Sequence, residues 1–83
     1  MKYYLVDDRC SDDKPKVMDE QELRVLSWNY ECLDLKDNME FYKEDSTCID
    51  LRVKCLNDCI NGDIEKVIWN LYERGFAITI IDR

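Results

Sequence analysis

The sequence predicts a single α+β domain spanning residues 1–83, in which a sheet of two or three strands is covered by about three helices. The chain closes with a helix, a glycine and a β-rich run over residues 63–83, and it opens with a second β-rich run at residues 2–6. Between these ends lie two stretches with helical apolar spacing. Two glycines and one proline are too few for an all-β fold built on tight turns. The predicted order is β-α-α-α-β.

The two terminal segments predict paired strands. Residues 2–6 read Lys-Tyr-Tyr-Leu-Val and residues 76–81 read Phe-Ala-Ile-Thr-Ile-Ile, both rich in the aromatic and branched side chains that favour a pleated surface. Each strand needs a partner for its edge, so we expect them to pair with each other. Residues 7–16 form a polar loop. Val17 and Met18 then either add a brief third strand or lead directly into the first helix.

The first helix is predicted from about residue 20 to about residue 36. Asp19 is a suitable N-cap and Glu22 follows at the third helical position, which is a capping-box arrangement. Met18 and Leu23 flank the cap as a hydrophobic staple. The predicted core-facing stripe is Leu23, Leu26, Tyr30 and Leu33. Residues 34–45 are ambiguous, either a helical continuation or an irregular loop held by aromatic side chains.

Two further helices are predicted before the last strand. The first begins at Ser46 or Thr47 and ends near Asn61, with an apolar stripe of Ile49, Val53, Leu56 and Ile60. The second follows Asp63 as its N-cap and presents Ile64, Val67, Ile68 and Leu71 on one face. Gly75 stands where a left-handed residue ends a helix without steric cost.

The five cysteines raise the question of a metal site. Cys48, Cys55 and Cys59 lie on one side of the helix that starts near residue 46, but of these only Cys55 and Cys59 have the spacing of structural zinc ligands. The chain has no histidine, so Cys10 or Cys32 would have to complete such a site. Free cysteine normally behaves as a small buried apolar residue, and we favour that role, with no metal bound. An odd count argues against a closed disulfide framework, so reduced thiols are expected.

No group of residues predicts catalysis or a cofactor site. Without histidine, a serine or cysteine nucleophile lacks its usual base, and no glycine-rich phosphate loop is present. The acidic pairs at residues 7–8 and 12–13 lie in or beside a polar loop, where such pairs are usually just solvated. We therefore expect a protein that is not an enzyme and takes no cofactor. A metal- or carboxylate-dependent enzyme is the less favoured alternative.

The charge balance limits the class of partner. A formal net charge of −7 disfavours direct binding to nucleic acid or to an anionic membrane, and suits a protein partner with a basic surface. The N-terminus lacks the pattern of a signal peptide, and no apolar run approaches the roughly 20 residues that span a bilayer. A cytoplasmic location is the default expectation.

A second apolar stripe on the first helix is the most informative feature for function. Its members are Val25, Trp28, Cys32 and Leu35, roughly opposite the core-facing stripe. Trp69 likewise lies off the apolar face of the last helix. Because tryptophan is enriched at protein interfaces, these residues are candidates for binding a partner or for forming a homodimer. The alternative is that the first helix is sandwiched between its neighbours, with both stripes in one core.

A dense acidic stretch covers residues 31–45. Glu31, Asp34 and Asp37 are its candidate partner-binding members, followed by Glu40, Glu44 and Asp45. Such charge is most often a solvated face. It could also imitate a phosphate backbone and occupy the nucleic-acid groove of a basic effector, although twelve basic residues dilute the field.

The general plan of the chain resembles the small acidic proteins that phages and other mobile elements encode. The features that carry the resemblance are a Lys-Tyr-Tyr strand, a Val-Met-Asp-Glu-Gln-Glu-Leu helix start and a closing Gly-Phe-Ala-Ile-Thr-Ile strand. Some proteins of that class, anti-CRISPR proteins among them, block a host defence effector in the host cytoplasm. The resemblance implies a non-enzymatic inhibitor or regulator of a nucleic-acid-handling effector. The alternative is a self-associating structural or regulatory subunit that uses the apolar face of the first helix.

Overall fold

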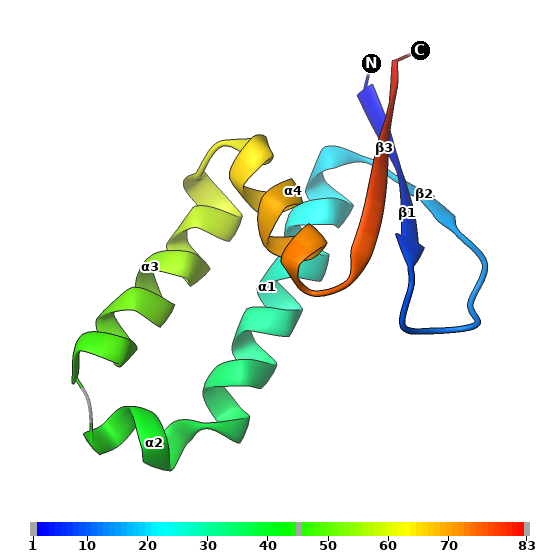
Figure 1. Cartoon of the computed structure of the whole chain (residues 1–83). Helices are drawn as coiled ribbons and strands as arrows, with labels where there is room; N and C mark the ends of the chain where they lie inside the picture. Colours follow the sequence, from blue (N-terminus) through cyan, green and yellow to red (C-terminus); the bar gives the residue numbers. More distant parts are fainter. Residues whose placement is uncertain (1, 45, 83) are drawn as a thin grey trace.

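The computed structural model describes residues 2–44 and 46–82, over which four helices and three strands follow in the order β1, β2, α1, α2, α3, α4 and β3 (Figure 1). The predicted α+β class is confirmed, as is the predicted arrangement of helices between two terminal strands. Within this part of the chain, no helix is both long enough and apolar enough to cross a membrane.

The sheet is antiparallel, with strand order β2-β1-β3. β1 (Lys2–Asp8) pairs with β3 (Phe76–Asp82) in one unbroken register, from Lys2 opposite Asp82 to Asp8 opposite Phe76. The predicted pairing of the terminal strands is therefore confirmed. β2 (Lys16–Met18) is short, and it decides the open question about Val17 and Met18 in favour of a third strand.

α1 (Glu20–Asp37) begins as its sequence predicts. The Asp19 carboxylate accepts a hydrogen bond of 2.8 Å from the backbone N–H of Glu22, which satisfies a donor of the first turn. At the other end, the backbone N–H and the side-chain amide of Asn38 both donate to the Asp34 carbonyl. α2 (Met39–Glu44) follows directly. The first helix therefore ends close to the predicted residue 36, and after the break at Asn38 the ambiguous segment is helical again up to Glu44.

α3 (Ser46–Asn61) and α4 (Ile64–Glu73) also lie where they are predicted. Asp63 is the N-cap residue of α4, but within the described chain its carboxylate makes no capping bond. Its backbone carbonyl instead accepts from the N–H of Lys66 at 3.0 Å. Gly75 has φ +97°, the left-handed conformation that lets the chain turn from α4 into β3.

The hydrophobic core lies between one face of the sheet and the helices α1 and α4. Alternate residues of the strands point toward α1 and α4. The strands and the helices each supply half of the buried core residues. The buried members are Tyr4, Val6, Leu23, Val67, Leu71 and Phe76. The apolar stripe predicted for α4 is correct, since Val67 and Leu71 are buried and Ile64 and Ile68 pack against them.

The stripes predicted for α1 and α3 are only partly correct. Leu33, Val53 and Ile60 are more than half exposed. The reason is that α1 runs past the end of the sheet, and α3 packs beside α1 instead of over the strands (Figure 1). Cys59 is the one apolar side chain that α3 buries within the described residues.

The C-terminal half of α1, together with α2 and α3, forms what we call the helical arm. In Figure 1, α2 joins the far ends of α1 and α3, well away from the sheet. The molecule measures 46 × 29 × 15 Å and its radius of gyration is 13.8 Å. A compact chain of this length would have a radius of gyration of about 12 Å. The arm is therefore a thin, extended structure that lacks a second packing layer.

Candidate functional site

A buried carboxylate stands at the junction of α1, α3 and α4. Glu31 is 1 % exposed, and its Oε1 accepts hydrogen bonds from Arg74 Nη2 at 2.7 Å and from Asn70 Nδ2 at 3.0 Å. Its Oε2 lies 3.5 Å from Arg52 Nη1 of α3. Two guanidinium groups and an amide thus compensate the cost of removing this charge from water.

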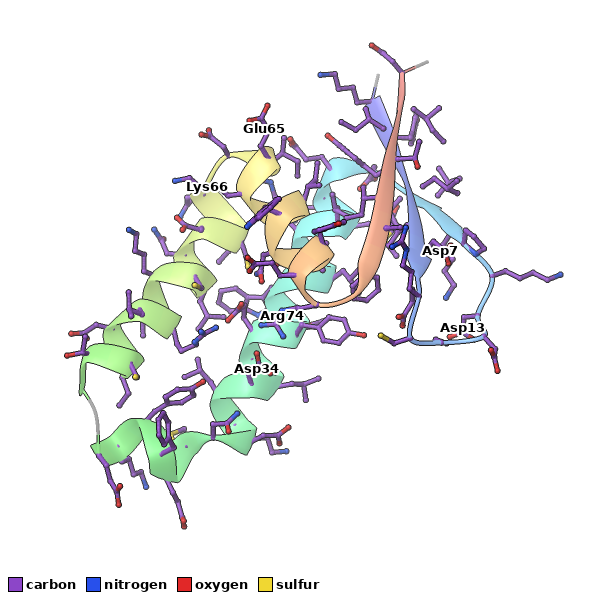
Figure 2. All side chains as sticks on the ribbon, in the orientation of Figure 1. Asp7, Asp13, Asp34, Glu65, Lys66 and Arg74 are labelled. Atoms are coloured by element: carbon purple, nitrogen blue, oxygen red, sulfur yellow. The ribbon has the colours of Figure 1, made fainter. Side chains whose placement is uncertain are left out.

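Arg74 connects this carboxylate to the surface. Its Nη2 also lies 2.6 Å from Oδ2 of Asp34, and Figure 2 shows Arg74 directed toward Asp34 across the gap between α4 and α1. Burial by itself lowers the pKa of Arg74, but hydrogen bonds and charges from Asp34 and Glu31 outweigh it and raise the pKa above its ordinary value. Its guanidinium also lies 5.9 Å from the ring centre of Tyr30. Arg74 Nε also donates to Asn70 Oδ1 at 3.3 Å, so the charged guanidinium contacts Glu31, Asp34, Asn70 and Tyr30.

A second part of the network fastens α3 to α1. Ser27 is fully buried, and its hydroxyl lies 3.1 Å from the Cys59 sulfur and 3.1 Å from Asn70 Nδ2. Nearby, Arg24 donates to the backbone carbonyls of Cys59 and Ile60 at 3.3 and 3.4 Å. The contact between α1 and α3 therefore depends on polar groups as much as on apolar packing.

Sequence reasoning missed this network. A usable signal was present, because Ser27 and Glu31 are four residues apart on α1, and Asn70 and Arg74 are four residues apart from α4 into its C-cap. Such pairs lie on one side of a helix. Apolar residues flank both pairs, and a polar residue in such a setting is either exposed or part of a buried network.

A groove of about 460 Å³ between α3 and α4 opens beside the network. Cys55 and Cys59 line it, together with Arg52, Glu31 and Trp69. Burial, followed by the charge of Glu31, raises the pKa of Cys55. Burial also raises the pKa of Cys59, although its hydrogen bond with Ser27 opposes the rise. Both shifts favour the protonated thiol, whereas the thiolate is the nucleophile and the metal ligand.

All five cysteines are free thiols, with Cys10 exposed and Cys59 buried. Across residues 2–44 and 46–82, no group of three or more cysteine, aspartate or glutamate side chains is arranged to hold a metal ion. Cys55 and Cys59, the pair with zinc-like spacing, both line the groove described above.

The second apolar stripe of α1 lies mainly on the side of α3. Trp28, Cys32 and Leu35 are half-buried, and Trp28 lines a hollow with Cys59 of α3. α1 is thus a middle helix, between α3 on one side and α4 with the sheet on the other. Val25 is the exception, because 47 % of it is exposed.

The acidic candidates occupy three different environments. Asp37 is exposed, Asp34 is partly exposed and paired with Arg74, and Glu31 is buried. The expectation that Glu31 belongs to an acidic surface is therefore wrong, since this carboxylate points into the junction of the three helices. Asp45 lies outside the described residues.

Trp69 is exposed, as its position off the apolar face of α4 predicts. It is 62 % exposed and stacks on Tyr72 with ring centres 5.7 Å apart. Tyr72, which sequence reasoning did not select, is 56 % exposed. Two large aromatic rings thus stand together on the outside of α4.

The helical arm carries exposed apolar side chains that sequence reasoning placed in the core or left unassigned. Six of those in its described part are between 45 and 62 % exposed: Leu33, Met39, Phe41, Leu51, Val53 and Ile60. Exposure of this many large apolar groups on one part of a small protein is unusual for a surface that faces only water.

No protein-family model, curated protein or solved structure matches this chain.

Proposed function

We propose that this chain is a non-enzymatic protein-binding module that blocks or regulates a larger effector by means of its helical arm. The observation that carries the proposal is the set of six exposed apolar side chains on the arm. Scattered exposed apolar residues are normal, but large groups of them mark surfaces that bind other proteins.

The construction of the arm supports this function. In Figure 1 the three helices of the arm form a single layer away from the sheet, whereas stable domains stack two or more layers around a core. A partner that lies against the arm would supply the missing layer.

Charge on the arm favours a partner with basic groups around an apolar contact. Asp37, Glu40 and Glu44 are exposed near the junctions of α1, α2 and α3, beside Phe41 and Met39. Acidic groups at the rim of an interface increase the rate of association with a basic surface and select against acidic partners. Effectors that handle nucleic acid carry such basic surfaces. The resemblance to phage-encoded proteins implies an anti-CRISPR-like inhibitor, which would act in the host cytoplasm.

The alternative, self-association through the second stripe of α1, has less support. Three of its four members are half-buried on the side of α3, which leaves Val25 as the main exposed apolar group of that face. Such a face offers much less apolar area than the arm does.

The proposal is tested by capturing partners from a candidate host lysate with three versions of the protein. The Phe41→Asp and Leu51→Asp variants place a charge on the arm, whereas Val17→Asp places one on β2, where Val17 is 52 % exposed. We expect the two arm variants to retain less than about a tenth of the partner, because desolvating a charge in an apolar contact is costly. The Val17→Asp variant should capture as much partner as the parent.

Charge is tested separately with Asp37→Lys combined with Glu40→Lys. This variant should bind more weakly, and the difference from the parent should shrink as salt is added. Circular dichroism must show that all variants are folded. Equal capture by the parent and by both arm variants would remove the arm from the binding surface.

A further inference from the structure

β3 is the edge strand of the sheet, on the side of α4 (Figure 1). It pairs with β1 over all seven residues, and no other strand in residues 2–44 and 46–82 reaches its second edge. Proteins usually protect such an edge with proline, lysine, a bulge or a very short strand. The described part of β3 has no proline, lysine or bulge: it reads Phe-Ala-Ile-Thr-Ile-Ile-Asp, its register is unbroken, and its one charged residue, Asp82, stands at its end.

The register identifies the backbone groups on the free edge. Arg9 N donates to the Gly75 carbonyl at 3.1 Å, which continues the pairing of β1 with β3 by one position. In an antiparallel ladder, hydrogen-bonded residue pairs alternate with pairs that are not hydrogen-bonded. Ala77, Thr79 and Ile81 therefore exchange hydrogen bonds with β1. Phe76, Ile78 and Ile80 alternate with these residues, so their backbone N–H and C=O groups point toward the open edge.

An apolar hollow of about 310 Å³ lies beside this edge. It is lined by Ile68, Trp69 and Tyr72 of α4 and by Ile78 of β3, with Glu65 at its margin. Ile80 lies on the same face of β3 as Ile78, two residues further on, and is 55 % exposed. The molecule thus offers an apolar hollow and an exposed apolar side chain at neighbouring positions of one strand.

We propose that two copies of this chain form a dimer by antiparallel pairing of their β3 edges about a two-fold axis at Thr79. In this register Ile78 of one copy lies opposite Ile80 of the other, and all seven residues of each strand are paired. Directly opposite side chains have Cβ atoms about 4.5–5.5 Å apart, which brings Ile80 of each copy to the hollow of the other. The result is a continuous six-stranded sheet.

In this register the backbone hydrogen bonds can form, and no like charges face each other. Residues with outward N–H and C=O groups lie opposite residues of the same kind, so the ladder hydrogen bonds can form. Asp82 lies opposite Phe76 of the second copy, and therefore no two like charges oppose each other along the strands. Thr79 lies opposite its own copy, where paired threonine hydroxyls are favourable.

The surface at this edge is large enough for a weak but specific dimer. An aromatic side chain buries roughly 150–250 Å² when it is fully covered, so the exposed parts of Trp69 and Tyr72 offer roughly 200–300 Å² together. Ile80 and the strand edge add to this area. The total approaches the lower end of the range of about 1,200–2,000 Å² that stable interfaces bury.

The first test is sedimentation equilibrium with the full chain over a range from about 1 µM to about 1 mM. We expect the mass to double with concentration, and association to strengthen with salt because each copy carries a net charge of −7. Ile80→Lys should raise the dissociation constant about 10–100-fold, because it replaces an apolar group that the dimer would bury with an edge-protecting charge. The arm variant Leu51→Asp should leave dimerisation unchanged, which separates this proposal from the function proposed for the arm.

The second test reports the register. Thr79→Cys, made in a Cys10→Ser background, should form an intermolecular disulfide under mild oxidation, because the two residues meet at the axis with Cα atoms about 4.5 Å apart. Ala77→Cys is the matched control, since Ala77 lies opposite Ile81 and not opposite itself. Hydrogen exchange should also slow with concentration at the amides of Ile78 and Ile80, but not at that of Thr79.

A strict monomer at the highest concentration would overturn the proposal and would leave the β3 edge available for a strand of another protein. A dimer that Ile80→Lys does not weaken, or that cross-links equally through Ala77→Cys, would also overturn it.

Discussion

Substitution of Glu31 by glutamine tests whether the buried polar network holds the helices together. The two side chains have the same shape, so the change removes a charge without creating a cavity. Glu31 accepts from Arg74, Asn70 and Arg52, and its side chain is 1 % exposed. A glutamine has one oxygen for these donors, and its NH₂ group would face a guanidinium group.

The loss of unfolding free energy depends on which hydrogen-bond partners each donor retains after the substitution. Arg74 retains Asp34 at 2.6 Å, and Asn70 Nδ2 retains the Ser27 hydroxyl at 3.1 Å. The pair with Arg52 is long and partly exposed at 36 %, so it adds little. The main loss is one short charge-assisted hydrogen bond, which contributes about 1.5–3 kcal/mol. We expect Glu31→Gln to lower the free energy of unfolding by about 2–3 kcal/mol.

This loss is large beside the stability expected for 83 residues, about 4–12 kcal/mol. With a urea dependence of about 1 kcal/mol per M, the unfolding midpoint should fall by roughly 2–3 M. The midpoint of thermal unfolding should fall by roughly 10–20 °C. Circular dichroism during urea and thermal unfolding measures both.

Asp37→Asn is the matched control, because it neutralises an exposed acid in the last turn of the same helix. Its effect should stay within about 0.5 kcal/mol. If Glu31→Gln also changed the free energy of unfolding by no more than that, the carboxylate would not be what fastens α4 and α3 to α1. A double-mutant cycle with Arg74→Gln would then be expected to show no coupling, whereas the network predicts about 1–2 kcal/mol.

Three further predictions concern the turn before β3 and the thiols. Gly75→Ala should lower the free energy of unfolding by about 1–2 kcal/mol in urea titrations, because Gly75 has φ +97° and an added Cβ would lie 2.9 Å from the Cys10 sulfur; an unchanged midpoint would show that the turn adapts. Iodoacetamide labelling followed by mass spectrometry should modify exposed Cys10 first and buried Cys59 last, and faster reaction at Cys59 would contradict the structure. The pKa values of Cys55 and Cys59 are raised, so at alkaline pH the folded protein keeps protons that the unfolded chain loses. The stability contributed by these thiols is therefore complete below about pH 8.5 and declines as the pH rises further. A Cys55→Ser, Cys59→Ser variant should therefore lose less stability than the parent between about pH 8 and about pH 10, and equal losses would refute this assignment.

Much of the fold was predictable because local signals and the sheet agreed with each other. Asp19 caps α1 as its spacing with Glu22 predicts, and Gly75 has the left-handed conformation that its position between helix and strand requires. The pairing of residues 2–6 with residues 76–81 required only that two β-rich termini satisfy each other's edges. The helix cap and the glycine turn depend only on neighbouring residues. The strand pairing was predictable because few other segments could form strands.

The arm could not be predicted in the same way. Periodicity shows that Leu33 shares a helical face with Leu26 and Tyr30, which pack against the core, but not where the sheet ends and leaves that face uncovered. The buried role of Glu31 was missed for a related reason. Charge in sequence indicates a surface, and only the positions of Arg74 and Asn70 on another helix show that this carboxylate is compensated in the interior.

The contrast between the two halves of the molecule supports the proposal that the arm binds a partner. Around the sheet, apolar side chains from β1, α1, α4 and β3 meet each other, and the core is complete. Along the arm, α3 contributes Cys59 to the interior and is held by Arg24, Ser27 and the Glu31 network. Its side chains Leu51, Val53 and Ile60 stay more than half exposed. Polar contacts fix the direction of a helix but do not remove apolar surface from water, which is the dominant favourable term in folding and in association. The sequence thus holds α3 in place without covering it, and this arrangement suits an element whose apolar surface is buried on binding.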